Sequence, residues 1–228
     1  MPPAPRPLLL VGAGGLARET LAAARSHDDP QWTPLGFLDD NPATHGTVLD
    51  GVPVLGPLEV VHERPEAAVV ICTGSSRDPG SRKRIQGRLD LPPDRYGTVL
   101  HAAASLARGT EVGPGSVLLA GTVVTAPQRI GAHVVAMPQV VLTHDDQVGD
   151  HVTMAARVTL AGGVRVGEGA YLGAGALVRE QLSIGDWSLV GMGAVVLADV
   201  PAYEVWVGNP ARRLRSMDAP ARNGAAPR

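Results

Sequence analysis

Aliphatic residues recur at every sixth position through the second half of the chain, from Leu106 to Val196. All sixteen of these positions are apolar, and fourteen are Leu, Val or Ile. Neither the 3.6-residue period of an α-helix nor the two-residue period of a strand predicts this spacing. The positions are Leu106, Val112, Leu118, Val124, Ile130, Ala136, Leu142, Val148, Met154, Leu160, Val166, Leu172, Val178, Ile184, Val190 and Val196.

A second period of eighteen residues predicts a solenoid with three sides per turn, each side being one hexapeptide. One aliphatic residue per side points inward, and neighbouring coils pair as parallel strands about 4.8 Å apart. The unbroken register predicts that no long loop interrupts the prism. Taken alone, the repeat also fits a purely structural protein, such as an antifreeze or scaffold protein. Five aliphatic–glycine pairs mark the period: Val112-Gly113, Ile130-Gly131, Val148-Gly149, Val166-Gly167 and Ile184-Gly185.

The first 95 residues follow a different pattern, which predicts strands alternating with a helix. Residues 7–11 are typical of a buried strand, a glycine turn follows at 12–17, and residues 17–25 have helical composition. Two further strands, 35–38 and 67–72, end in Asp39-Asp40 and in Thr73-Gly74-Ser75-Ser76. A strand, a glycine turn and a helix open a nucleotide-binding βαβ unit, in which glycines and the helix N-terminus approach a phosphate.

These patterns predict an α/β, Rossmann-like βαβ domain over residues 1–95, followed by a parallel β-helix over 96–215. Residues 216–228, rich in Ala, Pro and Arg, are expected to be disordered. Within the first domain, Gly12, Gly14 and Gly15 would approach the ligand, and Asp39 or Asp40 would lie where a ribose-binding carboxylate is expected. The glycine turn and the Asp pair, each taken alone, also fit ordinary solvated turns.

Composition excludes several classes of function. A net charge of −2 does not favour binding to nucleic acid or to an anionic membrane. A single cysteine, Cys72, cannot form an internal disulfide, so a cytoplasmic protein is expected. No apolar run is long enough for a membrane span. The 3% aromatic content suits a narrow interior filled by small aliphatic side chains.

The order of these features resembles that of the bacterial hexapeptide-repeat sugar O- and N-acetyltransferases, which include sialic acid O-acetyltransferase and the UDP-4-amino-sugar N-acetyltransferases. The resemblance covers nearly the whole chain: the glycine turn, Leu38-Asp39-Asp40, the prism, and the closing segment 207–211 (Val-Gly-Asn-Pro-Ala). It implies a left-handed prism, a homotrimer with active sites at the subunit interfaces, acetyl-CoA as co-substrate, a nucleotide sugar in the N-terminal domain, and no metal.

The resemblance also implies the site residues. His144, in Thr143-His144-Asp145, would be the general base, and Asp145 would orient its ring. The backbone N–H of Gly162 would stabilise the oxyanion. Three further positions, together with Gly162, would contact CoA: Thr153, Ala174 and Met192. In the N-terminal domain, Leu16 and Gly74 would lie near the pocket for the acceptor substrate, beside the glycines and Asp residues already named.

Some positions depart from the family pattern, and alternatives remain open. Leu16 stands where a His is frequent, Thr153 replaces another frequent His, and segment 73–76 replaces a Gly-Asn or Gly-Asp. An amino acid or a natural-product intermediate is therefore an alternative acceptor, and a non-catalytic hexapeptide protein a further one. Hexapeptide prisms also include zinc carbonic anhydrases, so His133 and His151 could share an ion with His144 as a third ligand.

Overall fold

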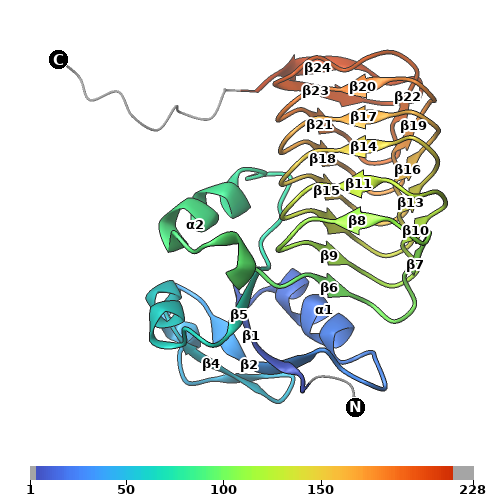
Figure 1. Cartoon of the computed structure of the whole chain (residues 1–228). Coiled ribbons are helices and arrows are strands. Elements are labelled where there is room, and N and C mark those ends of the chain that lie inside the picture. The colour runs from blue at the N-terminus through green and yellow to red at the C-terminus, as the bar shows by residue number, and fades with distance from the viewer. Residues whose placement is uncertain (1–3, 218–228) are drawn as a thin grey trace.

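The computed structural model describes residues 4–217, which form an α/β unit and a tall three-sided prism (Figure 1). In the α/β unit, β1, β2, β4 and β5 run parallel and β3 pairs antiparallel with β4, in the order β3-β4-β2-β1-β5. Helix α1 connects β1 to β2. The bounds are β1 Arg6–Val11, α1 Gly15–Ala24, β2 Trp32–Leu38, β3 Val48–Leu49, β4 Val52–Gly56, β5 Ala68–Ile71 and α2 Ser81–Leu89, with short 3-10 turns at Pro42–Thr44, Leu58–Glu63 and Pro93–Arg95.

Alternation along β1 divides this unit into two hydrophobic layers. Leu8 and Leu10 pack with α1 and with Val99, Val117 and Val135 of the prism, so one core joins the two parts of the chain. Leu9 and Val11 pack on the other side of the sheet, with the 3-10 turn and the last residue of α2. The sheet is therefore buried on both faces, as its continuous apolar strands require.

The prism confirms the eighteen-residue register. Val123 pairs with Val141 and Val148 with Val166, each eighteen residues along. The inward residues form one continuous aliphatic core. A second inward residue lies two positions before each predicted one, as at Val134, Val140 and Val152, which the six-residue period alone does not reveal.

Three sheets form the sides of the prism. The docking face packs against the α/β unit and comprises β6 Val99–Leu100, β9 Val117–Leu118, β12 Val135–Ala136, β15 Thr153–Met154, β18 Tyr171–Leu172, β21 Leu189–Val190, β23 Glu204–Val207 and β24 Arg212–Ser216. The apolar face comprises β7 Ser105–Leu106, β10 Val123–Val124, β13 Val141–Leu142, β16 Thr159–Leu160, β19 Leu177–Val178 and β22 Val195–Val196. The glycine face comprises β8 Glu111–Val112, β11 Arg129–Ile130, β14 Gln147–Val148, β17 Arg165–Val166 and β20 Ser183–Ile184.

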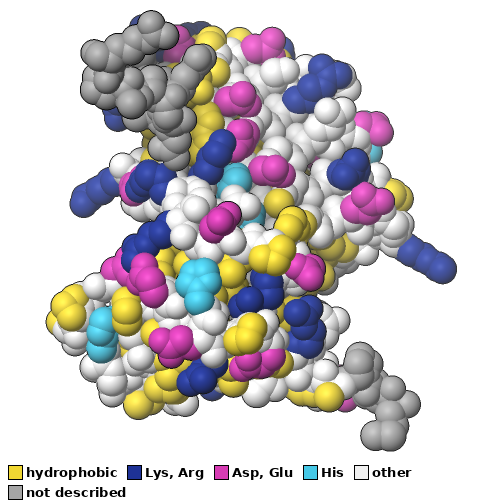
Figure 2. Space-filling model, turned by 60° about the vertical axis from the view of Figure 1, so that its left-hand side comes forward, with side chains coloured by type: hydrophobic (Ala, Val, Ile, Leu, Met, Phe, Trp, Pro, Cys, Tyr) yellow, Lys and Arg dark blue, Asp and Glu magenta, His cyan; other side chains and the backbone are white. Residues whose placement is uncertain are grey.

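The prism starts one strand before the first predicted repeat position, at β6, and ends in an antiparallel pair, β23 and β24. Ser216 is the last residue of β24, and residues 218–228 of the expected disordered tail lie outside the described residues. Among residues 4–217, no helix is long and apolar enough to cross a membrane. Acidic and basic side chains are interspersed over the face in Figure 2.

Candidate active site

His144 lies on the corner where the chain passes from the apolar face (β13) to the glycine face (β14), and we call residues 143–146 the His144 corner. Its Nδ1 lies 2.8 Å from Oδ2 of Asp145. Both side chains are open to solvent in the single chain, with 65% and 84% of their surface exposed. The contact between Nδ1 and the carboxylate leaves Nε2 as the nitrogen that can take a proton from a reacting group.

Gly162 lies directly under the His144 ring, one coil further along. A Cβ added to Gly162 would lie only 2.4 Å from Cε1 and 2.5 Å from Nε2 of His144. The next residue, Gly163, donates its N–H to the His144 carbonyl at 2.9 Å. The structure therefore brings together the three residues predicted as catalytic, and only glycine leaves space for the ring in this orientation.

The neighbouring Asp146 is buried, and sequence reasoning assigned it no role. Its Oδ2 accepts the Thr143 N–H at 2.8 Å, and its Oδ1 accepts the Val164 N–H at 2.9 Å. Burial raises the pKa of the Asp146 carboxyl to about 6, and the two N–H groups oppose that rise. Two adjacent aspartates of one loop thus have opposite environments: Asp145 is exposed and Asp146 is enclosed.

Ala174 and Met192 lie on a different corner, where the chain passes from the docking face to the apolar face. They are stacked on successive coils, because Gly193 donates its N–H to the Ala174 carbonyl at 2.9 Å. Met192 has 79% of its surface exposed. One chain therefore holds the predicted base and these two predicted CoA contacts on separate corners of the prism.

Thr153 is buried under the α/β unit instead of facing an open groove in the single chain. Its Oγ1 accepts a hydrogen bond from Nη2 of Arg82, at 2.7 Å. A Cβ added to Gly74 would lie 3.5 Å from Leu16 and 3.8 Å from the Thr153 hydroxyl. The structure thus brings Leu16 and Gly74 of the α/β unit next to Thr153 of the prism.

The glycine turn is held by the first aspartate of the Asp pair. Ala13 donates its N–H to Oδ2 of Asp39 at 2.8 Å, and Gly12 has a φ of +100°, which favours glycine. Gly14 caps α1 and Gly15 begins it; both are exposed, and a Cβ added to either would meet no atom within 4 Å. A small hollow of about 170 Å³ between Gly12, Asp39, Asp40 and Thr73 lies beside this turn.

The second aspartate is already paired. Arg88 of α2 binds the Asp40 carboxylate and the Glu59 carboxylate together, and the Arg88 hydrogen bond is the main reason that the pKa of Asp40 is lowered. The Leu58 N–H adds a weaker bond, at 3.3 Å. A ligand in this hollow would therefore meet an Asp40 carboxylate that is already paired with Arg88.

Helix α2, which the sequence pattern did not predict, docks on the remaining corner, where the chain passes from the glycine face to the docking face. We call residues 131–134 and 149–152 the His133–His151 corner. The two rings stack with centroids 5.1 Å apart and planes 9° apart. Burial is the largest cause that lowers the pKa of each histidine to about 4. Nε2 of His151 bonds Gln86 of α2 at 2.8 Å.

Arg82 of α2 holds this corner. Its guanidinium is fully buried and donates to the carbonyls of His133 (3.0 Å), His151 (2.6 Å) and Thr73 (2.6 Å). Because His144 lies on another corner, it cannot complete a three-histidine zinc site with the stacked pair. Within residues 4–217, no group of three or more His, Cys, Asp or Glu side chains is placed to hold a metal ion.

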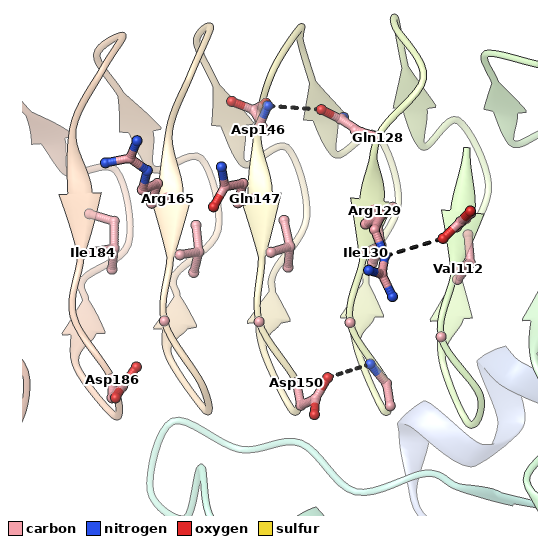
Figure 3. Close-up of a pocket in the computed structure, with 18 of the residues that line it drawn as sticks. Val112, Gln128, Arg129, Ile130, Asp146, Gln147, Asp150, Arg165, Ile184 and Asp186 are labelled. Carbon is pink, nitrogen blue, oxygen red and sulfur yellow. Dashed lines mark hydrogen bonds and ion pairs between the residues drawn. The ribbon is translucent and has the colours of Figure 1, made fainter. Parts of the chain in front are cut away.

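A hollow extends over the glycine face, from Asp145 and Asp146 at the His144 corner to the strip of glycines at the His133–His151 corner (Figure 3). The open hollow has a volume of about 1020 Å³. Arg129, Gln147 and Arg165 lie on its strands, and Asp146 lies at its edge with its N–H bonded to Gln128 (Figure 3). The hollow gives ligands access to the loop that carries His144.

Solved structures of sugar acetyltransferases resemble the chain over nearly its whole length. WeeI from Acinetobacter baumannii AYE is 30% identical, with a TM-score of 0.76 over 91% of this chain and 99% of that one. A mutant perosamine N-acetyltransferase from Caulobacter crescentus, in complex with CoA and GDP-perosamine, is 27% identical, with a TM-score of 0.81 over 91% and 96%.

The acetyltransferase domain of PglB from Neisseria gonorrhoeae FA1090, in complex with acetyl coenzyme A, is 24% identical and shows the same fold, with a TM-score of 0.81 over 92% and 100%. No protein-family model matches the sequence, and a search of curated proteins finds no match. Fold and site together define an acetyl-CoA-dependent acetyltransferase built on a hexapeptide-repeat prism. Within that class, the chain belongs to the hexapeptide-repeat sugar acetyltransferases.

Proposed function

We propose that this enzyme transfers the acetyl group of acetyl-CoA to an amino or hydroxyl group of a nucleotide-linked sugar, with His144 as general base. The observation that carries the proposal is the His144 ring, held between Asp145 and Gly162 with Nε2 available. The likeness to a perosamine N-acetyltransferase solved with CoA and GDP-perosamine supports a nucleotide amino sugar as the substrate.

The proposed chemistry is direct attack on the thioester. The substrate nitrogen or oxygen forms a bond to the acetyl carbonyl carbon, and neutral His144 accepts its proton at Nε2. Asp145 stabilises the imidazolium through Nδ1. The negative charge on the carbonyl oxygen is stabilised by the Gly162 N–H, for which no acceptor is found within residues 4–217. The bond to sulfur then breaks, and the proton passes from His144 to the CoA thiolate.

A homotrimer of left-handed prisms, with each site between two subunits, forms part of the proposal. The separation of His144 from Ala174 and Met192 supports it, because a second copy is needed to bring both sets to one groove. The apolar face offers a surface for that contact. Its outward stripe contains Val123, Val141, Leu177 and Val195, and Leu177 has 45% of its surface exposed. Exposed apolar stripes of this kind favour association.

The α/β unit is proposed to bind the acceptor substrate in a Rossmann-like manner, with residues 1–95 as a domain. The hollow beside Gly12 and Asp39 and the open N-terminus of α1 support a nucleotide there. Leu16 and Gly74, next to Thr153, would lie near the sugar. The cytoplasmic location expected from the single cysteine stays part of this proposal.

One observation favours the second candidate, an acyltransferase for an amino acid or a natural-product intermediate. Asp40 is engaged by Arg88, so only Asp39 of the Asp pair lacks a salt bridge, and Asp39 itself caps the glycine turn. A pocket with no free carboxylate would bind ribose less well. In that case, the prism chemistry would be unchanged and the acceptor domain would serve another molecule.

The deciding experiment measures CoA release from acetyl-CoA with GDP- and UDP-linked amino sugars, free sialic acid and amino acids. His144→Ala is assayed in parallel. Turnover with a sugar nucleotide that the variant loses would support the proposal. Turnover only with amino acids would favour the second candidate, and turnover unchanged in His144→Ala would exclude His144 as the base.

A further inference from the structure

Asp146 occupies a position in the prism core that the two following coils fill with aliphatic side chains. Eighteen residues later the same column holds Val164, and eighteen after that Leu182, both of which belong to the hydrophobic core. Eighteen residues earlier it holds Gln128. Asp146 has only 2% of its surface exposed. Burying a carboxylate costs free energy unless hydrogen bonds within the protein replace those that it made with water.

The hydrogen bonds of Asp146 connect three successive coils through the His144 corner. The Asp146 N–H donates to Oε1 of Gln128 in the preceding coil, at 2.9 Å (Figure 3). Oδ1 accepts from the Val164 N–H in the following coil, and Oδ2 accepts from the Thr143 N–H of the same corner. The last bond closes residues 143–146 into a turn that fixes the backbone on both sides of His144.

Asp145 constrains the position of the His144 ring less than the hydrogen bonds of Asp146 do. Its contact with His144 joins two well-exposed side chains, and exposed ion pairs of this kind contribute little. The backbone that carries the ring is held instead by the buried neighbour. We infer that Asp146 is the positioning residue of this site: its carboxylate holds the turn 143–146 so that the His144 ring stays over Gly162. The inference rests on the proposed function in taking His144 as the base.

The protonation state of Asp146 should then affect activity. Two N–H groups donate to its two oxygens, which suits the ionised form. His144 and Asp145 are the ionisable groups whose charges act on Asp146, while the preceding and following coils place Gln128 and Val164, which do not titrate, beside it. Because burial raises the pKa of Asp146 to about 6, the turn should become better ordered as pH rises through that value.

The contribution of Asp146 to the free energy of unfolding should change in the opposite direction over the same range. The folded pKa of Asp146 lies above its ordinary value of 3.8, so its stabilising contribution is present below pH 3.8 and is lost as pH rises through about 6. A residue kept only for folding would show this change in stability without any change in kcat. A positioning role predicts that, as pH rises through about 6, activity increases while the contribution of Asp146 to the free energy of unfolding decreases.

The test compares Asp146→Asn and Asp146→Val with Thr122→Val. Asn is isosteric but accepts at one oxygen only, and Val is the residue that the same column uses one coil later. Thr122 is buried in the prism core, and its hydroxyl has no hydrogen-bond partner within residues 4–217, so its replacement is the matched control. Steady-state CoA release gives kcat and KM, and hydrogen exchange of the peptide spanning 140–150 reports on the turn.

We expect kcat to fall about tenfold in Asp146→Asn and about 100-fold in Asp146→Val, since misplacing a catalytic group has effects of this size. KM for acetyl-CoA should stay within about twofold, and the turn should exchange faster in both variants but not in Thr122→Val. The acid limb of log kcat against pH should become less steep in Asp146→Asn, because the carboxyl at position 146 no longer titrates.

Two outcomes would overturn the inference. In the first, kcat and the acid limb are unchanged in Asp146→Asn. In the second, the turn exchanges no faster in either variant. Failure of the proposed function has a different signature: the wild-type protein releases no CoA with any sugar nucleotide. The assay is then run with the amino acid panel, where the same comparison of variants applies, and hydrogen exchange tests the turn without any substrate.

Discussion

Three histidines on two corners of the same prism show how one residue type acquires different roles. His144 has 65% of its side-chain surface exposed, while His133 and His151 are 1% and 5% exposed. The two buried histidines lie three residues after an inward aliphatic residue, with positive φ, a position that Asp145 takes at the His144 corner; His144 itself lies one residue earlier. The difference comes from α2, which covers the His133–His151 corner and leaves the His144 corner open. The position within the corner and the docked α/β unit together determine which histidine remains open to solvent.

The largest expected effect in this comparison is on His144 itself. His144→Ala should lower kcat about 1000-fold with little change in stability, because it removes a general base from an exposed position. The CoA-release assay and a thermal melt measure the two quantities. His62→Ala, an exposed histidine in the 3-10 turn of the α/β unit, is the control and should keep full activity. A His144→Ala enzyme within tenfold of wild type would remove the functional distinction between the corners.

Gly162→Ala should lower kcat about 100-fold, which would show that catalysis depends on the position of the His144 ring. The new methyl group would overlap the His144 ring, and the ring can move outward into solvent at small cost in folding free energy. The measurement is kcat together with the unfolding midpoint in urea. Gly87→Ala lies inside α2 with no atom within 4 Å of the added carbon, so it should retain activity and gain slightly in stability. Equal activity in the two variants would contradict the observed ring position.

Among these substitutions, Arg82→Met should lower the free energy of unfolding most. It tests whether Arg82 holds α2 on the His133–His151 corner. The substitution leaves four carbonyls and the Thr153 hydroxyl without this donor inside a buried interface. We expect the free energy of unfolding to fall by about 3 kcal/mol, measured in urea. Arg84→Met is the matched control on the same helix, because its exposed pair with Asp78 contributes little. A loss no greater than that of the control would mean that Arg82 does not hold the docked helix.

The smallest expected effect is a loss of stability in acid. The folded pKa values of His133 and His151 are about 4, below the ordinary value of 6.5. The unfolded chain therefore binds more protons between these values, and the free energy of unfolding should decrease as pH falls from about 6.5 to about 4. His133→Gln should flatten this decrease and His144→Ala should not, as followed by urea unfolding at several pH values. Identical slopes in all three proteins would exclude the stacked pair as the cause.

The regular part of the fold could be predicted from the sequence because one physical rule repeats. Each coil places an apolar residue inward on each of its three sides, so the six-residue pattern recurs at sixteen positions between Leu106 and Val196. The glycine turn and α1 follow from equally local signals. Helix α2 has no such signal: its buried residues are Arg82 and Leu89, so the apolar face that would identify an amphipathic helix is missing.

The expected site residues came from the family resemblance, and their roles in catalysis stay predictions. His144 and Asp145 are adjacent, and the structure also places Gly162 under the ring. Thr153 depends on Arg82, 71 residues earlier, and no local pattern indicates that pairing. Asp146 was overlooked because it follows two residues with an obvious chemical role. Its position in the inward column, shared with Val164, is the signal that could have identified it.

The hydrogen bonds from Arg82 to the carbonyls of His133 and His151 have a consequence for the design of chimeric enzymes. These two residues begin and end the single coil that carries His144, so one guanidinium ties both ends of that coil to the α/β unit. A chimera that joins this prism to a foreign acceptor domain would therefore need to retain α2 as a connector. With α2 retained, the preceding sheet and its turns could be replaced to change substrate choice, while the coil that performs the transfer keeps its anchorage.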